Sequence, residues 1–181
     1  GLEFPVVILA DLHKRFNADD FHRPVLVHPQ LGLGTERVDR QRRIRYDTVT
    51  KSAVAAALTR ESKAEEMRIL YVALTRAKEK LICVDCMSHA RKRAADLAVL
   101  AEMPAPPEAV AGAKCPGDWL LLPLLCAPEG EPIRRWAETE PQTLTGAGGG
   151  WQVQVWENPV APALRERDST PEEARESGPV E

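Results

Sequence analysis

Two short apolar runs, separated by a long stretch with helical periodicity, constrain the fold of this chain most strongly. Residues 5–10 read Pro-Val-Val-Ile-Leu-Ala, and residues 81–84 read Leu-Ile-Cys-Val. Continuous apolar runs of this length, rich in β-branched residues, are typical of strands buried on both faces of a parallel sheet. Between them, apolar residues recur at helical spacing from about Thr48 to Ala77. The order strand, helix, strand predicts an α/β fold with a parallel sheet.

The segment between the first strand and the helix has a different character. Residues 25–28 predict another short strand, and the glycines of Leu-Gly-Leu-Gly at 31–34 predict a turn. Residues 35–47 form either a charged loop or an exposed edge. They carry the arginines Arg37, Arg40, Arg42, Arg43 and Arg45. This cluster either follows a phosphate backbone or is a solvated surface, and its pattern alone leaves both interpretations open.

The composition changes at Pro104, where a proline-rich linker begins. Residues 118–125 predict a short helix interrupted at Pro123, and strict alternation over 151–156 predicts a half-buried strand. We therefore expect three parts. These are a main domain over 1–103, a linker and small appended unit over 104–157, and a disordered or connecting segment over 158–181, which is acidic and rich in proline.

Charge and cysteine content narrow the class of protein. Residues 1–103 hold 18 Lys and Arg against 14 Asp and Glu, a modest basic excess that suits a nucleotide or nucleic-acid surface. No apolar run approaches the roughly 18 residues of a membrane span, so we expect no membrane association. Cys-Val-Asp-Cys at 83–86 resembles half a zinc site, but no second pair follows at matching spacing. We expect reduced cysteines, no metal site and a cytoplasmic protein.

Two motifs in a fixed order carry the functional signal. The first is Gly-Leu-Glu-Phe at 1–4, and the second is Glu-Glu-Met-Arg-Ile-Leu-Tyr-Val-Ala-Leu-Thr-Arg-Ala at 65–77. Taken alone, Arg76 is a surface cation near a helix C-terminus, where the helix dipole favours positive charge. Taken together, the two strings resemble the last two conserved motifs of UvrD-like superfamily 1 DNA helicases. Because the sequence opens inside the first motif, we expect it to be a piece of a longer protein.

The resemblance extends beyond the two motifs. The string Phe-Pro-Val-Val-Ile-Leu-Ala-Asp-Leu at 4–12 is followed by Val-Leu-Val-His-Pro-Gln-Leu-Gly-Leu-Gly at 25–34. This order is similar to the AddA (RexA) subunits of the bacterial AddAB (RexAB) helicase–nucleases, whereas helicases of the UvrD and PcrA type usually lack the second string. The resemblance covers residues 1–86 well and 87–157 faintly. It implies the C-terminal half of the second RecA-like motor domain, a parallel-sheet fold of the P-loop NTPase type.

The resemblance also assigns roles to single residues. It makes Arg76 the arginine finger that reaches the γ-phosphate of ATP, with Thr75 and Glu66 helping to hold it. It places the Gly1 amide near the γ-phosphate and the Glu3 carboxylate at the ribose hydroxyls.

The roles of Tyr71 and of the arginines in the segment 35–47 are less well defined. By helical spacing Tyr71 belongs to the core, whereas by resemblance it joins the ATP site to the DNA groove. Arg42, Arg43 and Arg45 are the candidate DNA contacts.

The activity that the resemblance implies belongs to a larger parent. That parent would be one subunit of an ATP-dependent 3′→5′ DNA helicase and exonuclease, which works with a B-type (AddB or RexB) subunit in double-strand break repair by homologous recombination. Its ligands would be DNA, ATP and Mg²⁺. This chain alone should be inactive, because it has no Gly-rich loop ending in Gly-Lys-Ser/Thr. The alternatives are a UvrD-like helicase without a nuclease and a non-catalytic remnant that binds DNA or a partner.

Overall fold

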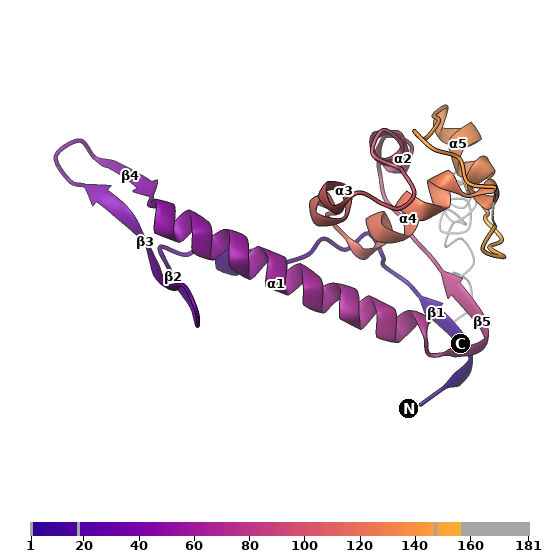
Figure 1. The fold of residues 1–181 in the computed structure, drawn as a ribbon, viewed down its shortest axis with the longest axis horizontal. Coiled ribbons are helices and arrows are strands. Elements are labelled where there is room, and N and C mark those ends of the chain that lie inside the picture. The colour runs from indigo at the N-terminus through magenta and orange to yellow at the C-terminus, as the bar shows by residue number, and fades with distance from the viewer. Residues whose placement is uncertain (1, 18, 147, 157–181) are drawn as a thin grey trace, which may run out of the picture.

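A computed structural model describes residues 2–17, 19–146 and 148–156. In it, strand β1 (Phe4–Leu9) lies beside strand β5 (Ala77–Cys83) in a two-stranded parallel sheet, and the long helix α1 (Val49–Leu74) precedes β5 and packs beside the sheet (Figure 1). The predicted α/β fold with a parallel sheet is therefore confirmed. The segment 158–181, for which we expect disorder, lies outside the described residues.

Helix α1 begins where the sequence predicts it. Thr48 is the N-cap, and its side-chain oxygen accepts a hydrogen bond from the backbone N–H of Lys51 at 3.2 Å. The following 26 residues contain neither glycine nor proline, so nothing in the sequence interrupts the helix. Its buried side chains include Val54 and Leu70, which belong to the two ends of the predicted apolar face.

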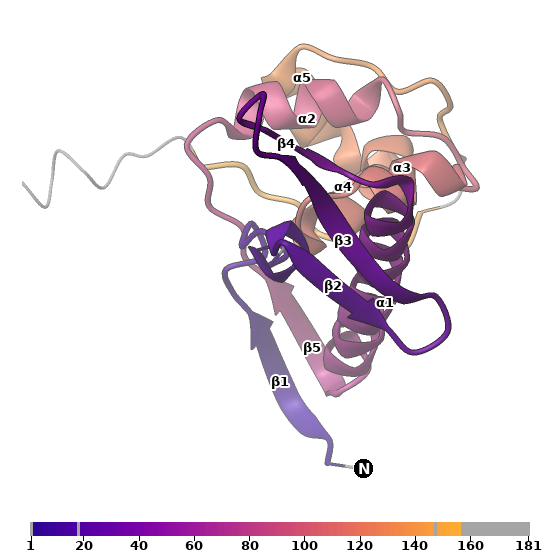
Figure 2. The same ribbon diagram turned by 90° about the vertical axis from the view of Figure 1, so that its left-hand side faces the viewer.

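A second, antiparallel sheet covers the N-terminal half of α1. It consists of β2 (Val25–His28), β3 (Gly32–Asp39) and β4 (Ile44–Asp47), and a short 3₁₀ turn over Asp19–His22 precedes it. Figure 2 shows this sheet in front of the helix, and Figure 1 shows that it lies at the end remote from β1 and β5. The strand predicted at 25–28 is confirmed. The turn predicted at 31–34 is wrong for residues 32–34, because β3 already begins at Gly32 and the turn occupies 29–31.

The arginine-rich segment forms two strands of this sheet. Residues 35–39 continue β3 and residues 44–47 form β4, with the chain reversing over 40–43. Of the two alternatives for 35–47, the exposed edge describes only 44–47, because residues 35–39 belong to the central strand β3 and 40–43 form a turn.

Within the described residues, four short helices follow β5 and pack together above the parallel sheet (Figure 1). They are α2 (Ala90–Ala98), α3 (Pro107–Gly112), α4 (Pro116–Cys126) and α5 (Glu131–Ala137), with a 3₁₀ turn over Pro128–Gly130. Their main core is formed by small and aliphatic side chains, among them Ala98, Leu122 and Leu125. None of the helices in the described ranges combines the length and the apolar character that a membrane span requires.

A smaller core joins these helices to the motif-bearing half. Leu12, which follows β1, packs with Leu70 of α1 and with Ala113 and Trp119 of the helical part. The Trp119 indole N–H also donates to the Val110 carbonyl oxygen at 2.9 Å. Residues on either side of the composition change at Pro104 thus share one set of buried contacts.

Three further local predictions are wrong. Helix α4 continues through Pro123 instead of breaking there. Residues 151–156 form no strand, although Val153 and Val155 do pack against the helical core. Strand β1 is not buried on both faces, because Phe4, Val6 and Ile8 are all at least half exposed. A two-stranded sheet covered by one helix leaves such side chains open.

Candidate functional site

The junction between α1 and β5 brings Thr75 and Arg76 to the start of the parallel sheet. Thr75 is the C-cap of α1, and its hydroxyl lies within hydrogen-bonding distance of the carbonyl oxygens of Tyr71 and Val72, both at 3.0 Å. The Tyr71 carbonyl oxygen also accepts the backbone N–H of Thr75 at 3.1 Å, so the hydroxyl adds a side-chain contact to the last turn of the helix. Thr75 thereby fixes the point at which the chain leaves the helix, and with it the position of Arg76.

Arg76 contacts the N-terminal motif with both its backbone and its side chain. Its carbonyl oxygen accepts a hydrogen bond from the Phe4 N–H at 2.9 Å, and its Nη1 donates to the Leu2 carbonyl oxygen at 3.1 Å. The two bonded positions flank Glu3, whose side chain is exposed. The structure therefore brings together two motifs that lie about seventy residues apart in the sequence. Gly1 lies outside the described residues.

The Arg76 guanidinium retains most of its capacity to bind an anion. A guanidinium has five N–H donors in a planar fork, and here one nitrogen contacts a neutral carbonyl group. Among the described residues, no carboxylate forms an ion pair with Arg76. Its positive charge is consequently not neutralised within this part of the chain, and the fork suits a phosphate group.

Glu66 does not lie at this junction. It is ten residues before Arg76, about 15 Å along the helix axis, and it contributes to an open pocket of about 560 Å³ beyond the C-terminal end of β1. The walls of this pocket also include Leu9, Leu70 and Lys14. In this structure Glu66 therefore does not hold Arg76, and of the two predicted supporting residues only Thr75 is adjacent to it.

Tyr71 is exposed, which contradicts the interpretation of this residue as part of the core. Its side chain is 67% accessible, on the last turn of α1, while Leu70 beside it is buried. Periodicity alone could not distinguish these neighbours, because both fall within the width of an amphipathic stripe.

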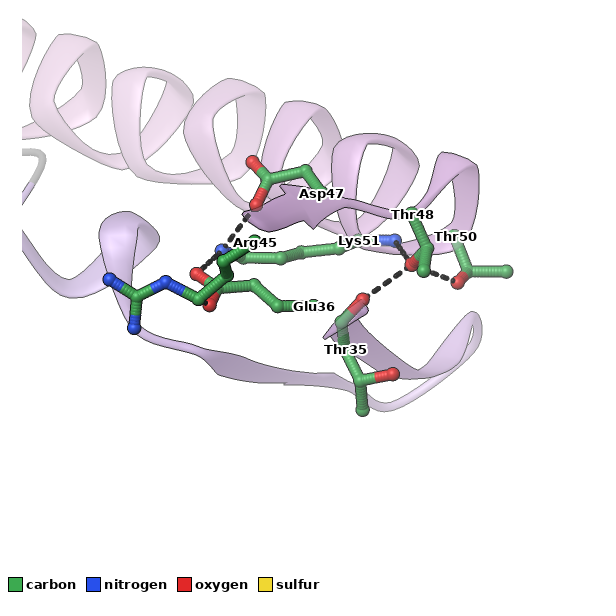
Figure 3. A network of polar contacts seen from close by, with 7 residues as sticks. All are labelled: Thr35, Glu36, Arg45, Asp47, Thr48, Thr50 and Lys51. Atoms are coloured by element: carbon green, nitrogen blue, oxygen red, sulfur yellow. Dashed lines mark hydrogen bonds and ion pairs between the residues drawn. The ribbon is translucent and has the colours of Figure 1, made fainter. Parts of the chain in front are cut away.

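The opposite end of α1 holds a second cation in a different environment (Figure 3). Lys51 is 3% exposed, and its Nζ donates to Glu36 Oε1 at 2.7 Å and to Asp47 Oδ1 at 2.8 Å. The hydrogen bond to Asp47, followed by that to Glu36, raises the pKa of Lys51 above its ordinary value. This network joins α1 to both β3 and β4.

The arginines predicted as DNA contacts lie near this network. Arg45 Nε is 3.2 Å from Glu36 Oε2, so its charge is shared with the network around Lys51 (Figure 3). Arg42 lies at the tip of the hairpin, with its Nε 4.0 Å from Asp39 Oδ2. Arg43 is exposed in the same turn and adopts a left-handed conformation with φ of 55°. Arg42 and Arg43 therefore remain accessible to a phosphate backbone, whereas Arg45 already forms an ion pair with Glu36.

The Leu-Gly-Leu-Gly string has a structural explanation. Gly32 has a φ of +78°, and a Cβ at Gly34 would lie 2.6 Å from the Cα of Lys51, so β3 can approach α1 this closely only at a glycine. His28 Nδ1 accepts the backbone N–H groups of Gln30 and Leu31, both at 3.1 Å, and its Nε2 lies 3.1 Å from Glu61 Oε1. These contacts fix the hairpin turn and attach it to α1.

A buried charged pair holds the helical part together. Arg93 of α2 donates two hydrogen bonds to Asp118, which is fully buried at the start of α4 and also accepts the N–H of Lys114 at 2.6 Å. Burial alone would raise the pKa of Asp118, but its hydrogen bond from Arg93 and that from the backbone of Lys114 outweigh this effect and lower it. Asp85 is not part of this pair, and burial raises the pKa of its carboxyl group.

Sequence reasoning missed these charged contacts because their partners are remote in the chain. His28 and Glu61 are 33 residues apart, Arg93 and Asp118 are 25 apart, and Lys51 and Glu36 are 15 apart. The contact of Lys51 with Asp47, by contrast, joins residues four apart, a spacing that the sequence could have suggested.

The cysteines of Cys-Val-Asp-Cys are free, with Cys83 partly buried and Cys86 exposed. Burial raises the pKa of the Cys83 thiol, which keeps it protonated at neutral pH.

Comparison with known proteins identifies the family of this chain. Residues 1–88 match the UvrD-like helicase C-terminal domain. The chain is 50% identical over 148 residues to the A-type subunit of the ATP-dependent helicase/nuclease of Heliobacterium modesticaldum, covering 78% of this chain and 10% of that protein. It is 41% identical over 159 residues to the protein of the same name from Thermoanaerobacter sp., and 38% identical over 159 residues to that of Bacillus thuringiensis subsp. konkukian.

These last two matches cover 86% of this chain and 13% of each relative, so the chain spans only about a tenth of the length of the relatives it resembles. The similarity continues well beyond residue 88, into the helices that follow β5. By its domain and by these relatives, the chain belongs to the UvrD-like helicases and corresponds to a segment of the A-type (AddA) subunits of the ATP-dependent helicase/nucleases.

Proposed function

We propose that this chain contributes the arginine finger and a ribose contact to the ATP site of a helicase/nuclease. The observation that carries the proposal is the contact of Arg76 with the backbone around Glu3. This contact brings the Arg76 guanidinium, whose charge is not neutralised by a described carboxylate, close to the exposed residue Glu3 at one end of the parallel sheet. An arginine at such a place stabilises negative charge that develops on a transferring phosphoryl group, which is worth roughly 10³–10⁵ in rate.

The residues present fit a part of an ATP site and not the whole of it. Arg76 would bind the γ-phosphate, Glu3 would accept hydrogen bonds from the ribose hydroxyl groups, and the Gly1 amide would lie near the phosphate. Thr75 would act as a positioning residue. Mg²⁺ and the phosphate-binding loop would be supplied by other parts of the parent protein, so the chain alone would not hydrolyse ATP. In the parent, hydrolysis of ATP would supply the energy for moving along DNA.

We further propose that the parent acts on DNA with 3′→5′ polarity and degrades it as an exonuclease, together with a B-type subunit, in recombinational repair in the cytoplasm. Similarity to the A-type subunits over 148 residues or more, well past residue 88, favours this parent over a UvrD-type helicase without a nuclease. Arg42 and Arg43, accessible at the tip of the hairpin, are the proposed DNA contacts, with Arg45 in a lesser role.

Replacement of Arg76 by alanine in the full-length protein tests the proposal. DNA-dependent ATP turnover should fall by at least about 100-fold, because the transition-state charge loses its counter-charge. Arg68→Ala is the matched control, since Arg68 lies on the neighbouring helix α1, is 76% exposed and forms an ion pair with Glu65. The control should stay within about twofold of wild type, as expected for an exposed pair of small energetic value. Near-normal turnover of the Arg76 variant, at an unchanged thermal midpoint, would contradict the assignment.

A further inference from the structure

The pairing of β1 with β5 shifts by one residue near the N-terminal end of β1. Residues 6–9 of β1 pair one by one with residues 80–83 of β5. Continued without interruption, this register would set Phe4 opposite Lys78. Phe4 instead lies opposite Ala77, so β5 has one more residue than β1 between this pair and the next. This is the arrangement of a β-bulge.

The residue at which the pairing shifts is Pro5, and its chemistry explains the shift. Leu9 accepts the backbone N–H of Val84 at 2.8 Å, so the backbone groups of Leu9 face β5. The direction of these groups alternates along a strand, so those of position 5 would face β5 as well. A residue there would donate its N–H to β5, but proline has no N–H to donate. Prolines inside sheets are confined to edges, strand starts and bulges for this reason.

Before Pro5 the chain resumes its pairing one residue out of step. Phe4 donates its N–H to the Arg76 carbonyl oxygen at 2.9 Å, although in an unbroken ladder the backbone groups of Phe4 would face away from β5. Without the bulge, Glu3 would take this place opposite the Arg76 carbonyl. The difference is one residue along the strand, about 3.3 Å, and it would send each side chain before Pro5 to the opposite face of the sheet.

The contacts proposed for ATP lie on the displaced side of the bulge. Arg76 Nη1 donates to the Leu2 carbonyl oxygen at 3.1 Å, and Glu3 lies between the two residues that Arg76 contacts. In an unbroken ladder the Leu2 carbonyl would lose its place beside the guanidinium, and the Glu3 side chain would leave the face that it now occupies. The register before Pro5 therefore decides how the two motifs face each other.

The helix holds Arg76 in place independently of β1. The backbone N–H of Arg76 donates to the Ala73 carbonyl oxygen at 3.2 Å, directly after the C-cap Thr75. Because the Arg76 backbone is tied to the end of α1, it would not follow a slip of β1. A slip would consequently move Leu2 and Glu3 relative to Arg76 and not together with it.

We infer that Pro5 is a positioning residue for the ATP site. By lacking an N–H group, it holds the first motif one residue out of step and sets Leu2 and Glu3 against Arg76. This role rests on the proposed function, from which it takes the roles of Arg76 and Glu3. Pro5 is exposed, so burial among the described residues does not account for a proline at this position.

Replacement of Pro5 by valine in the full-length protein tests this role. Valine restores the missing donor and favours a strand, so β1 can pair with β5 without the bulge. The kcat of DNA-dependent ATP turnover should fall at least about tenfold, because a misplacement of about 1 Å can cost about 10²-fold in rate. The KM for ATP should change less than about threefold, since the loss falls on a transition-state contact. The thermal midpoint should not fall, because the ladder gains a hydrogen bond.

Two further variants sharpen the test. Pro5→Ala restores the same N–H with a weaker preference for strands, and kcat should fall in the same direction by at least about threefold. Pro24→Val is the matched control, because Pro24 is also exposed and directly precedes a strand, β2, at the other end of α1. The control should leave kcat and KM unchanged.

Combination with Arg76→Ala separates positioning from general damage. If Pro5 acts through Arg76, Pro5→Val should lower kcat no more than about twofold further in the Arg76→Ala protein, because residues that act as a unit are not additive. Unchanged kcat in the Pro5→Val protein would overturn the inference. An equal loss in both backgrounds, or a lowered thermal midpoint, would also overturn it, since Pro5 would then serve the stability of the fold alone.

Failure of the proposed function gives a different pattern. In that case Arg76→Ala would itself leave turnover near normal, and the role of Pro5 would be lost together with that of Arg76. If Arg76→Ala lowers turnover and Pro5→Val does not, the ATP site stands and only the role of Pro5 is overturned.

Discussion

The two ends of α1 hold their cations in opposite ways. At the N-terminal end, Lys51 is almost fully enclosed and its charge is matched by Glu36 and Asp47. At the C-terminal end, Arg76 is partly exposed and contacts a neutral carbonyl group. A cation whose partners are already in place contributes to the fold, whereas a cation without a counter-charge is available to a ligand. The charge balance around a side chain, more than its position in a motif, therefore separates a cation that supports the fold from one that is available to a ligand.

The largest effect should follow from replacing Arg76, the cation without a counter-charge, by lysine. Arg76→Lys keeps the charge but loses the planar fork, so DNA-dependent ATP turnover in the full-length protein should still fall at least about 100-fold. Lys51→Arg is the corresponding exchange at the other end and should leave turnover within about twofold, because that cation has no part in the ATP site. Full activity of the Arg76→Lys variant would show that charge alone suffices, and the proposed contrast would then fail.

The hairpin end should be the more sensitive to steric change. Gly34→Ala puts a Cβ within 2.6 Å of the Lys51 backbone and should cost about 2 kcal/mol. Gly32→Ala meets open space but retains a φ of +78°, and should cost about 1 kcal/mol. Native-state hydrogen exchange of the β2 and β3 amides measures both. Equal protection in the two variants would contradict the close approach of β3 to α1.

Titration of Lys51 should reveal its structural role. Because its pKa is raised in the folded state, its contribution to stability is complete below the unfolded value of about 10.4 and is lost as the pH rises through the folded value. The difference in thermal midpoint between wild type and Lys51→Met should therefore be constant up to about pH 10 and shrink above it. Lys51→Arg, which stays charged, should show no such decrease. A difference that does not change across this range would rule out the contribution.

The smallest effect concerns the arginines near the hairpin tip. If Arg42 and Arg43 bind phosphates, replacing both by glutamine should reduce the slope of log K against log salt for DNA by about 1.5 units. Arg45→Gln should change it less, because Arg45 already pairs with Glu36. An unchanged slope in the double variant would assign the cluster to a solvated surface.

Local patterns in the sequence predict the elements of this fold well. The apolar runs at 5–10 and 81–84, the short strand at 25–28 and the capped start of the helix at Thr48 all depend on residues close together in the chain. Their burial depends on what lies against them, which is why β1 is exposed against expectation. The alternation at 151–156 likewise describes side chains that pack, without a neighbouring strand to make them a sheet.

The candidate site likewise has one part that the sequence predicts and another that only the structure shows. The motif predicts Arg76 and Thr75 at one junction because they are adjacent in the chain, and the structure adds that Leu2 and Phe4 meet Arg76 there. It does not bring Glu66 to Arg76, since nearly three helical turns separate them.

The glycines at 32 and 34 show the same limit at the other end of the helix. They suggest a turn because glycine permits one. The actual requirement at Gly34 comes from the backbone of Lys51, which no local pattern could show.

The length and the uninterrupted sequence of helix α1 have a mechanical consequence. Its 26 residues contain no glycine or proline and make a rod about 39 Å long. Lys51 fastens the hairpin to one end of this rod, His28 adds a contact with Glu61 at its middle, and Thr75 fastens the chain that bears Arg76 to the other end. A tilt of about 5° about either end would move the opposite end by roughly 3 Å for a rod of this length. That displacement is as large as a hydrogen bond is long, so a load on the hairpin could break or make the Arg76 contact with Leu2.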